Sequence, residues 1–129
     1  MSNIGNMSEP EKEVGKLLDE LGIWWKYEYP LFVYDDVERP RIWTPDFFLP
    51  VLGIFIEVCG SGDVDYYFRE RVYDKNVCRV IFVHHYKEPE KWKSFLVQRL
   101  FDMQIKRLRE TGNAIQRARK MGIEFQVNI

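Results

Sequence analysis

Apolar residues recur at helical spacing near the start of the chain. Between Val14 and Leu21 they return every three or four positions, and Ser8 to Glu11 forms a capping box with a proline in its first turn. Gly22 follows the last apolar position, and glycine is common just past a helix end. The pattern predicts an amphipathic helix that begins after Ser8 and ends at Gly22.

Three strand-like segments follow this helix. Residues 23–34 are rich in aromatic residues, and residues 42–49 form a second candidate strand, in which Pro45 leaves one ladder hydrogen bond unmade. Residues 54–59 are apolar at every position except Glu57. A nearly continuous apolar run is typical of a central strand that is covered on both faces.

The remainder of the chain alternates between helix and strand patterns. Residues 65–76 have helical character, residues 77–83 form a β-branched strand, and residues 89–120 are helical again, with a break predicted at residues 111–113 (Thr-Gly-Asn). Apolar and polar residues then alternate over residues 123–129, which predicts a short terminal strand.

The order of these elements defines the expected fold class. A helix, three consecutive strands, a helix and a fourth strand predict an α/β protein with a mixed sheet flanked by helices, followed by an added C-terminal helical segment. The first three strands are expected to pair antiparallel. The helix between the third and fourth strands makes that last pair parallel through a right-handed crossover.

The composition agrees with one globular domain. The chain has 129 residues, of which 46% are hydrophobic and 30% are charged, and this argues against intrinsic disorder. We expect a single domain over residues 1–129, with a core at about residues 8–86 and a basic helical extension at about residues 87–129.

Charge is divided unevenly along the chain, although the formal net charge is only −1. Residues 1–86 hold 9 basic and 15 acidic side chains, whereas residues 87–120 hold 10 basic and 4 acidic ones. The near-neutral total is therefore a cancellation. A basic helical segment can lie along phosphates, or it can simply be a solvated face.

Three features predict an intracellular, cytoplasmic protein without a membrane partner. Residues 1–10 carry neither the basic region nor the apolar run of a signal peptide. No apolar segment is long enough to span a bilayer. Cys59 and Cys78 have neither CxxC spacing nor the density of a disulfide-rich secreted protein, so we expect reduced thiols.

Two carboxylates lie close together in the predicted sheet. Asp46 in the second strand and Glu57 in the third are joined by a strand end, a turn and a strand start, which can bring both side chains to one end of the sheet. A charge inside a buried strand must be paired or must bind a metal. Glu57 is therefore explained either by a structural salt bridge or by a site where Asp46 and Glu57 hold Mg²⁺.

These residues resemble the PD-(D/E)xK nuclease superfamily, which has a restriction-endonuclease-like fold. The resemblance rests on residues 44–49 (TPDFFL) and 56–58 (IEV), on the helix before them and on the strand after them, and it covers residues 8–83. The αβββαβ core of the family has the element order expected here. The resemblance implies that Asp46 and Glu57 bind a catalytic Mg²⁺, which Mn²⁺ can replace, without an organic cofactor.

The resemblance also implies an additional acidic metal-binding position on the first helix. Glu11 is the candidate by sequence position. Glu11 and Glu13 flank the apolar stripe of that helix on its two sides, so helical geometry does not choose between them. Glu11 is also well placed to cap the helix.

Cys59 stands where the family has a lysine, and a thiol cannot supply a positive charge. A small buried cysteine is most often a packing residue. Some family members carry the lysine on the following helix, so the resemblance suggests Lys75 as the displaced lysine and Arg71 as a phosphate clamp. Both could also be solvated side chains paired with Glu70 or Asp74.

The terminal residues of the fourth predicted strand, His84 and His85, have a simpler interpretation. Adjacent strand residues point to opposite faces, which argues against a metal site built from both histidines. We interpret them as a polar cap of the strand end.

The predicted function is a Mg²⁺-dependent endonuclease that hydrolyses DNA phosphodiester bonds with structure selectivity or weak sequence specificity. Catalysis would involve Asp46, Glu57 and Lys75. DNA would be contacted by basic residues of the helices, namely Arg69, Arg71, Lys106 and Arg107.

Two alternatives to an active nuclease stay open. Cys59 favours a nucleic-acid-binding module of the same fold that has lost catalysis. The amphipathic segment from Trp92 to Leu108 favours a protein-interaction subunit, which could pair with a partner or with a second copy of the chain as a homodimer.

Overall fold

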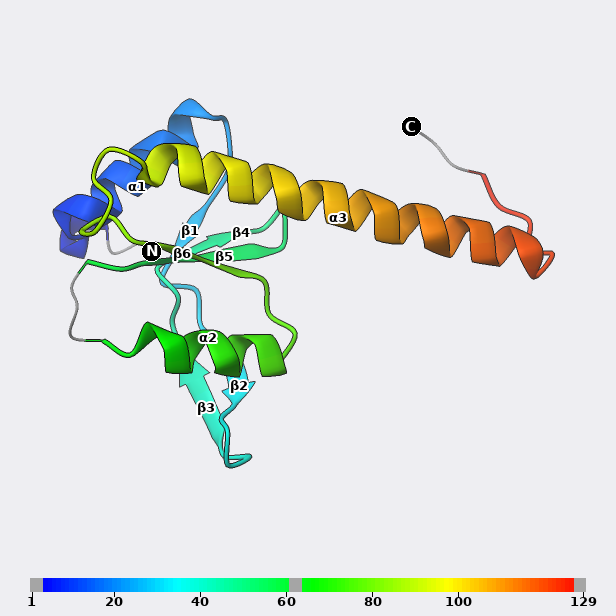
Figure 1. The fold of residues 1–129 in the computed structure, drawn as a ribbon, viewed down its shortest axis with the longest axis horizontal. Coiled ribbons are helices and arrows are strands. Elements are labelled where there is room, and N and C mark those ends of the chain that lie inside the picture. Colours follow the sequence, from blue (N-terminus) through cyan, green and yellow to red (C-terminus); the bar gives the residue numbers. More distant parts are fainter. Residues whose placement is uncertain (1–3, 61–63, 127–129) are drawn as a thin grey trace. The chain divides into compact units, whose positions relative to one another are not determined.

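Residues 4–60 and 64–126 are described by a computed structural model (Figure 1). The chain divides into two compact units, Met1–Leu96 and Val97–Ile129. The elements of the described residues are, in chain order, the 3-10 helix η1 (Ile4–Asn6), α1 (Glu9–Glu20), β1 (Lys26–Tyr27), β2 (Leu31–Tyr34), β3 (Pro40–Trp43), β4 (Phe47–Leu49), β5 (Ile54–Val58), α2 (Tyr66–Lys75), β6 (Val80–Val83) and α3 (Trp92–Lys120).

The ends of α1 are set by local hydrogen bonds. The Ser8 hydroxyl accepts from the N–H of Glu11 at 3.3 Å, and the Glu11 carboxylate accepts from the N–H of Ser8 at 3.2 Å, which completes the capping box. At the other end Gly22 has φ +72°, and the N–H of Ile23 donates to the carbonyl of Leu18 at 2.9 Å. The predicted boundaries of this helix are confirmed.

The main sheet is mixed and has the strand order β1-β4-β5-β6. β4 pairs antiparallel with both β1 and β5, and β5 pairs parallel with β6. All five residues of β5 are buried, which confirms a central strand covered on both faces. The α/β class with a mixed sheet and flanking helices is therefore confirmed.

Two segments predicted as single strands are each divided between two sheets. Residues 23–34 form both β1 and β2, because Glu28 turns the backbone with φ +53°. Residues 42–49 contain the end of β3 and all of β4, and Pro45, which has no N–H to donate, lies between them. β2 and β3 make a separate antiparallel sheet, the β2–β3 hairpin.

Different elements cover the two faces of the main sheet (Figure 1). α1 lies on one side, with Val14 and Leu18 fully buried. On the other side, α2 and the β2–β3 hairpin share a core cluster with the sheet, whose buried members are Val33, Cys59, Val72, Tyr73 and Phe82. Asn76 ties the hairpin to α2, because its amide accepts from the N–H of Tyr34 at 2.9 Å and donates to the carbonyl of Tyr34 at 2.8 Å.

Two further predicted boundaries are corrected. β6 begins at Val80 rather than at Val77, because Val77 has φ +57° and belongs to the turn after α2. The terminal strand is not formed over residues 123–126, which follow the helix end at Gly122 with φ +77°. The rest of that predicted strand, residues 127–129, lies outside the described residues.

α3 runs without the break predicted at residues 111–113. No proline interrupts this stretch, and a single glycine costs a helix only about 1 kcal/mol. The Thr111 hydroxyl donates to the carbonyl of Arg107 at 2.9 Å, so its polar group is satisfied within the helix. In the parts of the chain that the structure describes, no helix combines the length and the apolar character needed to cross a membrane.

The buried face of α1 predicts a difference between two leucines. Leu18→Ala removes a fully buried side chain, and Leu21→Ala removes one that is 44% exposed just after the same helix. We expect Leu18→Ala to lower the free energy of unfolding by about 2–5 kcal/mol and Leu21→Ala by less than about 1 kcal/mol. Urea denaturation followed by circular dichroism measures both, and equal losses would contradict the face that α1 buries.

Candidate functional site

Asp46 and Glu57 lie opposite each other where β4 and β5 pair. The register joins Phe47 to Ile56, so Asp46, one position before β4, continues the ladder opposite Glu57. Directly opposite residues of an antiparallel pair project from the same face. The N–H of Val58 donates to Asp46 Oδ2 at 2.6 Å, which holds this carboxylate against β5. The structure therefore brings the two predicted acidic residues together.

Glu57 is a buried charge with two partners on α2. Its side chain is only 5% exposed, Arg69 Nη1 lies 3.2 Å from Glu57 Oε2, and the Tyr73 hydroxyl donates to Glu57 Oε1 at 2.9 Å. Burial raises the pKa of Glu57, and the Tyr73 hydrogen bond and the Arg69 charge only partly offset this rise. The structural salt bridge considered for Glu57 is present, and its cation is Arg69.

The ionisation of Asp46 is disfavoured in the folded protein. Burial is the largest cause that raises the pKa of Asp46 to about 7, and the carboxylates of Glu57 and Glu11 add to the rise. The N–H of Val58 acts in the opposite direction. We call Asp46, Glu57 and Glu11 the acidic site. A cation bound near these residues would reduce the repulsion between their carboxylates.

The structure distinguishes Glu11 from Glu13, which helical geometry alone does not. Glu11 is half-buried, accepts a hydrogen bond from the Tyr27 hydroxyl at 2.7 Å and raises the pKa of the other two acidic-site residues. Glu13 is exposed and pairs with His85. Glu11 therefore caps α1 and also contributes its charge to the acidic site.

Lys75 is held elsewhere on the protein. Its ammonium donates to the carbonyl of Asp35 at 2.7 Å and pairs with Glu38, both at the turn between β2 and β3. Arg71 is exposed, and its guanidinium carbon lies 5.8 Å from the centre of the Phe68 ring. The role of Lys75 as the displaced lysine stays a prediction, and the contacts of its ammonium are with the β2–β3 hairpin.

The contacts of Arg69 and Tyr73 with Glu57 are the part of the site that sequence reasoning missed. The sequence predicts Arg69 only as a DNA contact and indicates no role for Tyr73. A signal is present in retrospect, because Arg69, Val72, Tyr73 and Asn76 follow the i, i+3, i+4, i+7 spacing of one helix face. Val72 and Tyr73 are buried, so this face, rather than the one with Lys75, is turned inward.

Cys59, which stands where the resemblance implies a lysine, packs inside the protein. It is fully buried and belongs to the core cluster under α2. Burial raises the pKa of the Cys59 thiol to about 12, and the carboxylates of Glu57 and Asp46 contribute to this rise. The thiol is neutral at physiological pH, so this position supplies no positive charge.

The second unit carries the other predicted DNA contacts and is described by itself. Lys106 and Arg107 are exposed on α3. Residues 97–120 hold 7 basic and 2 acidic side chains. Phosphate binding by this segment stays a prediction.

The donor set of the acidic site suits a hard cation. Mg²⁺ binds proteins through one or two carboxylates and keeps several of its waters. Within residues 4–60 and 64–126, no group of three or more His, Cys, Asp or Glu side chains is arranged to hold a metal ion. Metal binding by Asp46 and Glu57, with Glu11 as a further ligand, therefore stays a prediction.

Comparisons with known proteins add no relative. Protein-family models, curated proteins and solved structures were each searched, and none matches this chain. The chemistry of the acidic site and of Arg69 therefore has to indicate the function.

The raised pKa of Asp46 predicts how stability depends on pH without divalent metals. An aspartate in the unfolded chain ionises near pH 4 and Asp46 in the folded protein at about 7, so the folded state holds more protons in this window and stability falls as pH rises. Asp46→Asn removes this loss and keeps an acceptor oxygen for the N–H of Val58. We expect the free energy of unfolding of the variant to exceed that of the wild type by up to about 4 kcal/mol near pH 8. The difference should disappear near pH 4.

Urea denaturation at a series of pH values in EDTA measures this difference. Asp74→Asn removes an exposed carboxylate of α2 and should reproduce the wild-type profile. A difference between Asp46→Asn and the wild type that stays constant with pH would contradict the burial of the Asp46 charge.

Proposed function

We propose that this protein is a metal-dependent endonuclease that hydrolyses DNA phosphodiester bonds. The observation that carries the proposal is the meeting of Asp46 and Glu57 across β4 and β5, with Arg69 bound to Glu57. Two carboxylates beside a guanidinium combine the groups that hold a divalent cation with a group that binds the adjacent phosphate.

The arrangement of elements around the acidic site supports a restriction-endonuclease-like fold. α1, the strands β1, β4 and β5, the helix α2 and the parallel strand β6 reproduce the αβββαβ order that the resemblance implies. The β2–β3 hairpin is then an insertion between the first and second strands of that core. Asp46 directly precedes β4 and Glu57 lies within β5, as the motif requires.

Asp46 and Glu57 would hold Mg²⁺, and Mn²⁺ could replace it because it accepts the same oxygen donors. The chemistry that such an ion supplies when bound is activation of a water molecule and stabilisation of charge on the phosphate. The N–H of Val58 and the hydroxyl of Tyr73 orient the two carboxylates. Glu11 adds negative charge that favours a cation.

Arg69 supplies the positive charge that Cys59 cannot. A guanidinium stays protonated at physiological pH, so its contribution is electrostatic rather than that of a general base. The Arg69 side chain is 39% exposed, whereas Glu57 is 5% exposed, so Arg69 reaches from the buried carboxylate to the surface. There it can donate to a phosphate oxygen in the bidentate manner typical of arginine.

Exposed basic residues of both units would bind the DNA backbone. Arg71 on α2 and Lys106 and Arg107 on α3 are exposed. Contacts to phosphates position the DNA without distinguishing its bases. Structure-selective or weakly sequence-specific cleavage follows, with an affinity that decreases as salt increases.

The roles of Arg69 and Lys75 can be separated by mutation. We expect Asp46→Asn, Glu57→Gln and Arg69→Ala each to slow cleavage by about 100-fold or more, because each removes a group that stabilises charge in the transition state. Lys75→Ala, a matched loss of one cation from the same helix, should cleave at close to the wild-type rate. Plasmid, flapped and four-way DNA incubated with Mg²⁺ or Mn²⁺ provide the assay.

Two outcomes would contradict the proposal. Equal cleavage by the wild type and Asp46→Asn would remove Asp46 from the reaction. Binding of DNA without any cleavage, and without dependence on Mg²⁺, would identify a nucleic-acid-binding module in which Cys59 marks the loss of catalysis.

Metal binding gives a test that does not depend on activity. At a Mg²⁺ concentration 100 times its dissociation constant, binding should stabilise the folded protein by about 2.7 kcal/mol. We expect this stabilisation to be lost in Asp46→Asn and reduced in Glu11→Gln, which keeps a side chain able to complete the capping box. Glu13→Gln, on the same helix, is the control and should respond as the wild type does. Thermal unfolding with and without Mg²⁺ measures the effect, and equal responses in Glu11→Gln and Glu13→Gln would exclude Glu11 from the site.

A further inference from the structure

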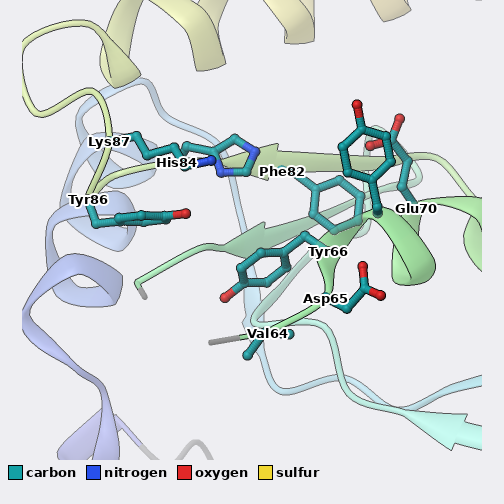
Figure 2. Close-up of a pocket in the computed structure, with 9 residues that line it drawn as sticks. Val64, Asp65, Tyr66, Glu70, Phe82, His84, Tyr86 and Lys87 are labelled. Atoms are coloured by element: carbon teal, nitrogen blue, oxygen red, sulfur yellow. The ribbon is translucent and has the colours of Figure 1, made fainter. Parts of the chain in front are cut away.

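A cavity of about 360 Å³ lies between the N-terminal end of α2 and the end of β6 (Figure 2). The rings of Tyr66, His84 and Tyr86 surround its open space. The ring centres of Tyr66 and His84 are 6.1 Å apart, and those of His84 and Tyr86 are 6.3 Å apart. We call these three residues the aromatic pocket.

The aromatic pocket adjoins the acidic site. Phe82, which also lines the cavity, is the β6 partner of Glu57, so both side chains project from the same face of the sheet. The guanidinium carbon of Arg69 lies 6.0 Å from the centre of the Tyr66 ring. Tyr66 therefore lines the cavity and also lies next to Arg69, which binds Glu57.

His84 lacks the hydrogen bond expected of a polar strand cap. Its Nδ1 atom is buried and has no hydrogen-bond partner among the residues that the structure describes. Buried polar atoms of native proteins normally have a partner, so the end of β6 leaves one polar atom of His84 unsatisfied. The imidazole ring itself lines the cavity, and such a ring can stack on a base.

The charges around the cavity favour a neutral ring over a second phosphate. Asp65 and Glu70 line it together with Lys87, so the lining is not predominantly positive. Carboxylates repel phosphates, but they accept hydrogen bonds from the exocyclic amino groups of bases. The Lys87 ammonium lies 5.6 Å from the centre of the Tyr86 ring, so it can reach a phosphate that flanks a base stacked there.

We propose that the aromatic pocket receives one nucleobase of a DNA strand whose neighbouring phosphate is bound at Arg69. This inference deepens the proposed nuclease function and rests on it for the identity of the ligand. Every base has a π-face, so stacking in such a pocket tolerates all four bases. A base can enter only after it leaves the duplex stack, so the pocket selects single-stranded, flapped or distorted DNA.

Two synthetic strands of identical backbone charge test the pocket. One is an octamer in which every nucleotide is an abasic analogue, and the other carries a single thymine at its centre. The full chain is titrated into each fluorescent strand in EDTA, and the anisotropy gives both dissociation constants. We expect the wild type to bind the one-base strand about tenfold more tightly, as one base–aromatic stack would require.

Two pocket variants and one matched control accompany the wild type. Tyr86→Ala and His84→Ala should bind the two strands alike. Tyr34→Ala removes a tyrosine that is 46% exposed on the β2–β3 hairpin, against 37% for Tyr86, and it should keep the preference for the one-base strand. Circular dichroism verifies the fold of each variant. The comparison of the two strands with the wild-type protein does not depend on any variant.

Equal binding of the two strands by the wild type, or a preference that survives in both pocket variants, overturns the inference. Free thymidine monophosphate that competes as strongly as the one-base strand also overturns it, because the cavity would then be a mononucleotide site. The assay contains no metal, so it is independent of cleavage. A base preference without cleavage would support base binding in the aromatic pocket and contradict the proposed nuclease function. Cleavage without a base preference would support the nuclease function and contradict base binding in the pocket.

Discussion

The burial of the Glu57 charge in the central strand is the constraint on which the first unit depends. A carboxylate in a strand that is covered on both faces is stable only with close partners. Arg69 and Tyr73 supply them from α2, which fixes the side of the sheet on which α2 lies and the face that it turns inward. The Trp43 ring then packs against Tyr73 with ring centres 5.2 Å apart, so the β2–β3 hairpin follows α2. The contacts of Glu57 with Arg69 and Tyr73 thus link the central strand, the helix α2 and the hairpin.

The parts of the fold that sequence reasoning predicted are those with local or topological signals. α1 has a capping box and a terminal glycine, β5 is apolar at every position except Glu57, and a helix between two neighbouring strands favours a parallel pair. The aromatic segments 23–34 and 42–49 were not predictable in the same way. Each contributes to two sheets, and hydrophobicity does not show where one sheet ends and another begins. Only the positive φ of Glu28 and the missing N–H of Pro45 mark those points.

The acidic residues of the candidate site could be predicted from the sequence for a similar reason. Asp46 and Glu57 flank a short connection, and the pairing of two adjacent antiparallel strands brings such residues together. The basic partner of Glu57 could not be predicted from the sequence. α2 offers two candidate pairs at the same spacing of four residues, Arg69 with Tyr73 and Arg71 with Lys75. Only the burial of Val72 and Tyr73 decides between these two faces. The choice between Glu11 and Glu13 likewise depends on tertiary neighbours, Tyr27 for one and His85 for the other.

Under the proposed function, the crowding of carboxylates makes the cation necessary in two respects. Asp46 has a pKa of about 7, and a proton and a metal ion exclude each other at the same oxygens, so affinity for a cation should rise until Asp46 is ionised. Arg69 neutralises only one of the three negative charges of the acidic site. Residues 1–86 carry 15 acidic side chains against 9 basic ones, so a DNA phosphate approaching Asp46 and Glu57 without a bound cation would meet net repulsion. A cation that activates a water molecule would therefore also allow the phosphate to reach the site, whereas the basic segment 87–120 would attract DNA without it.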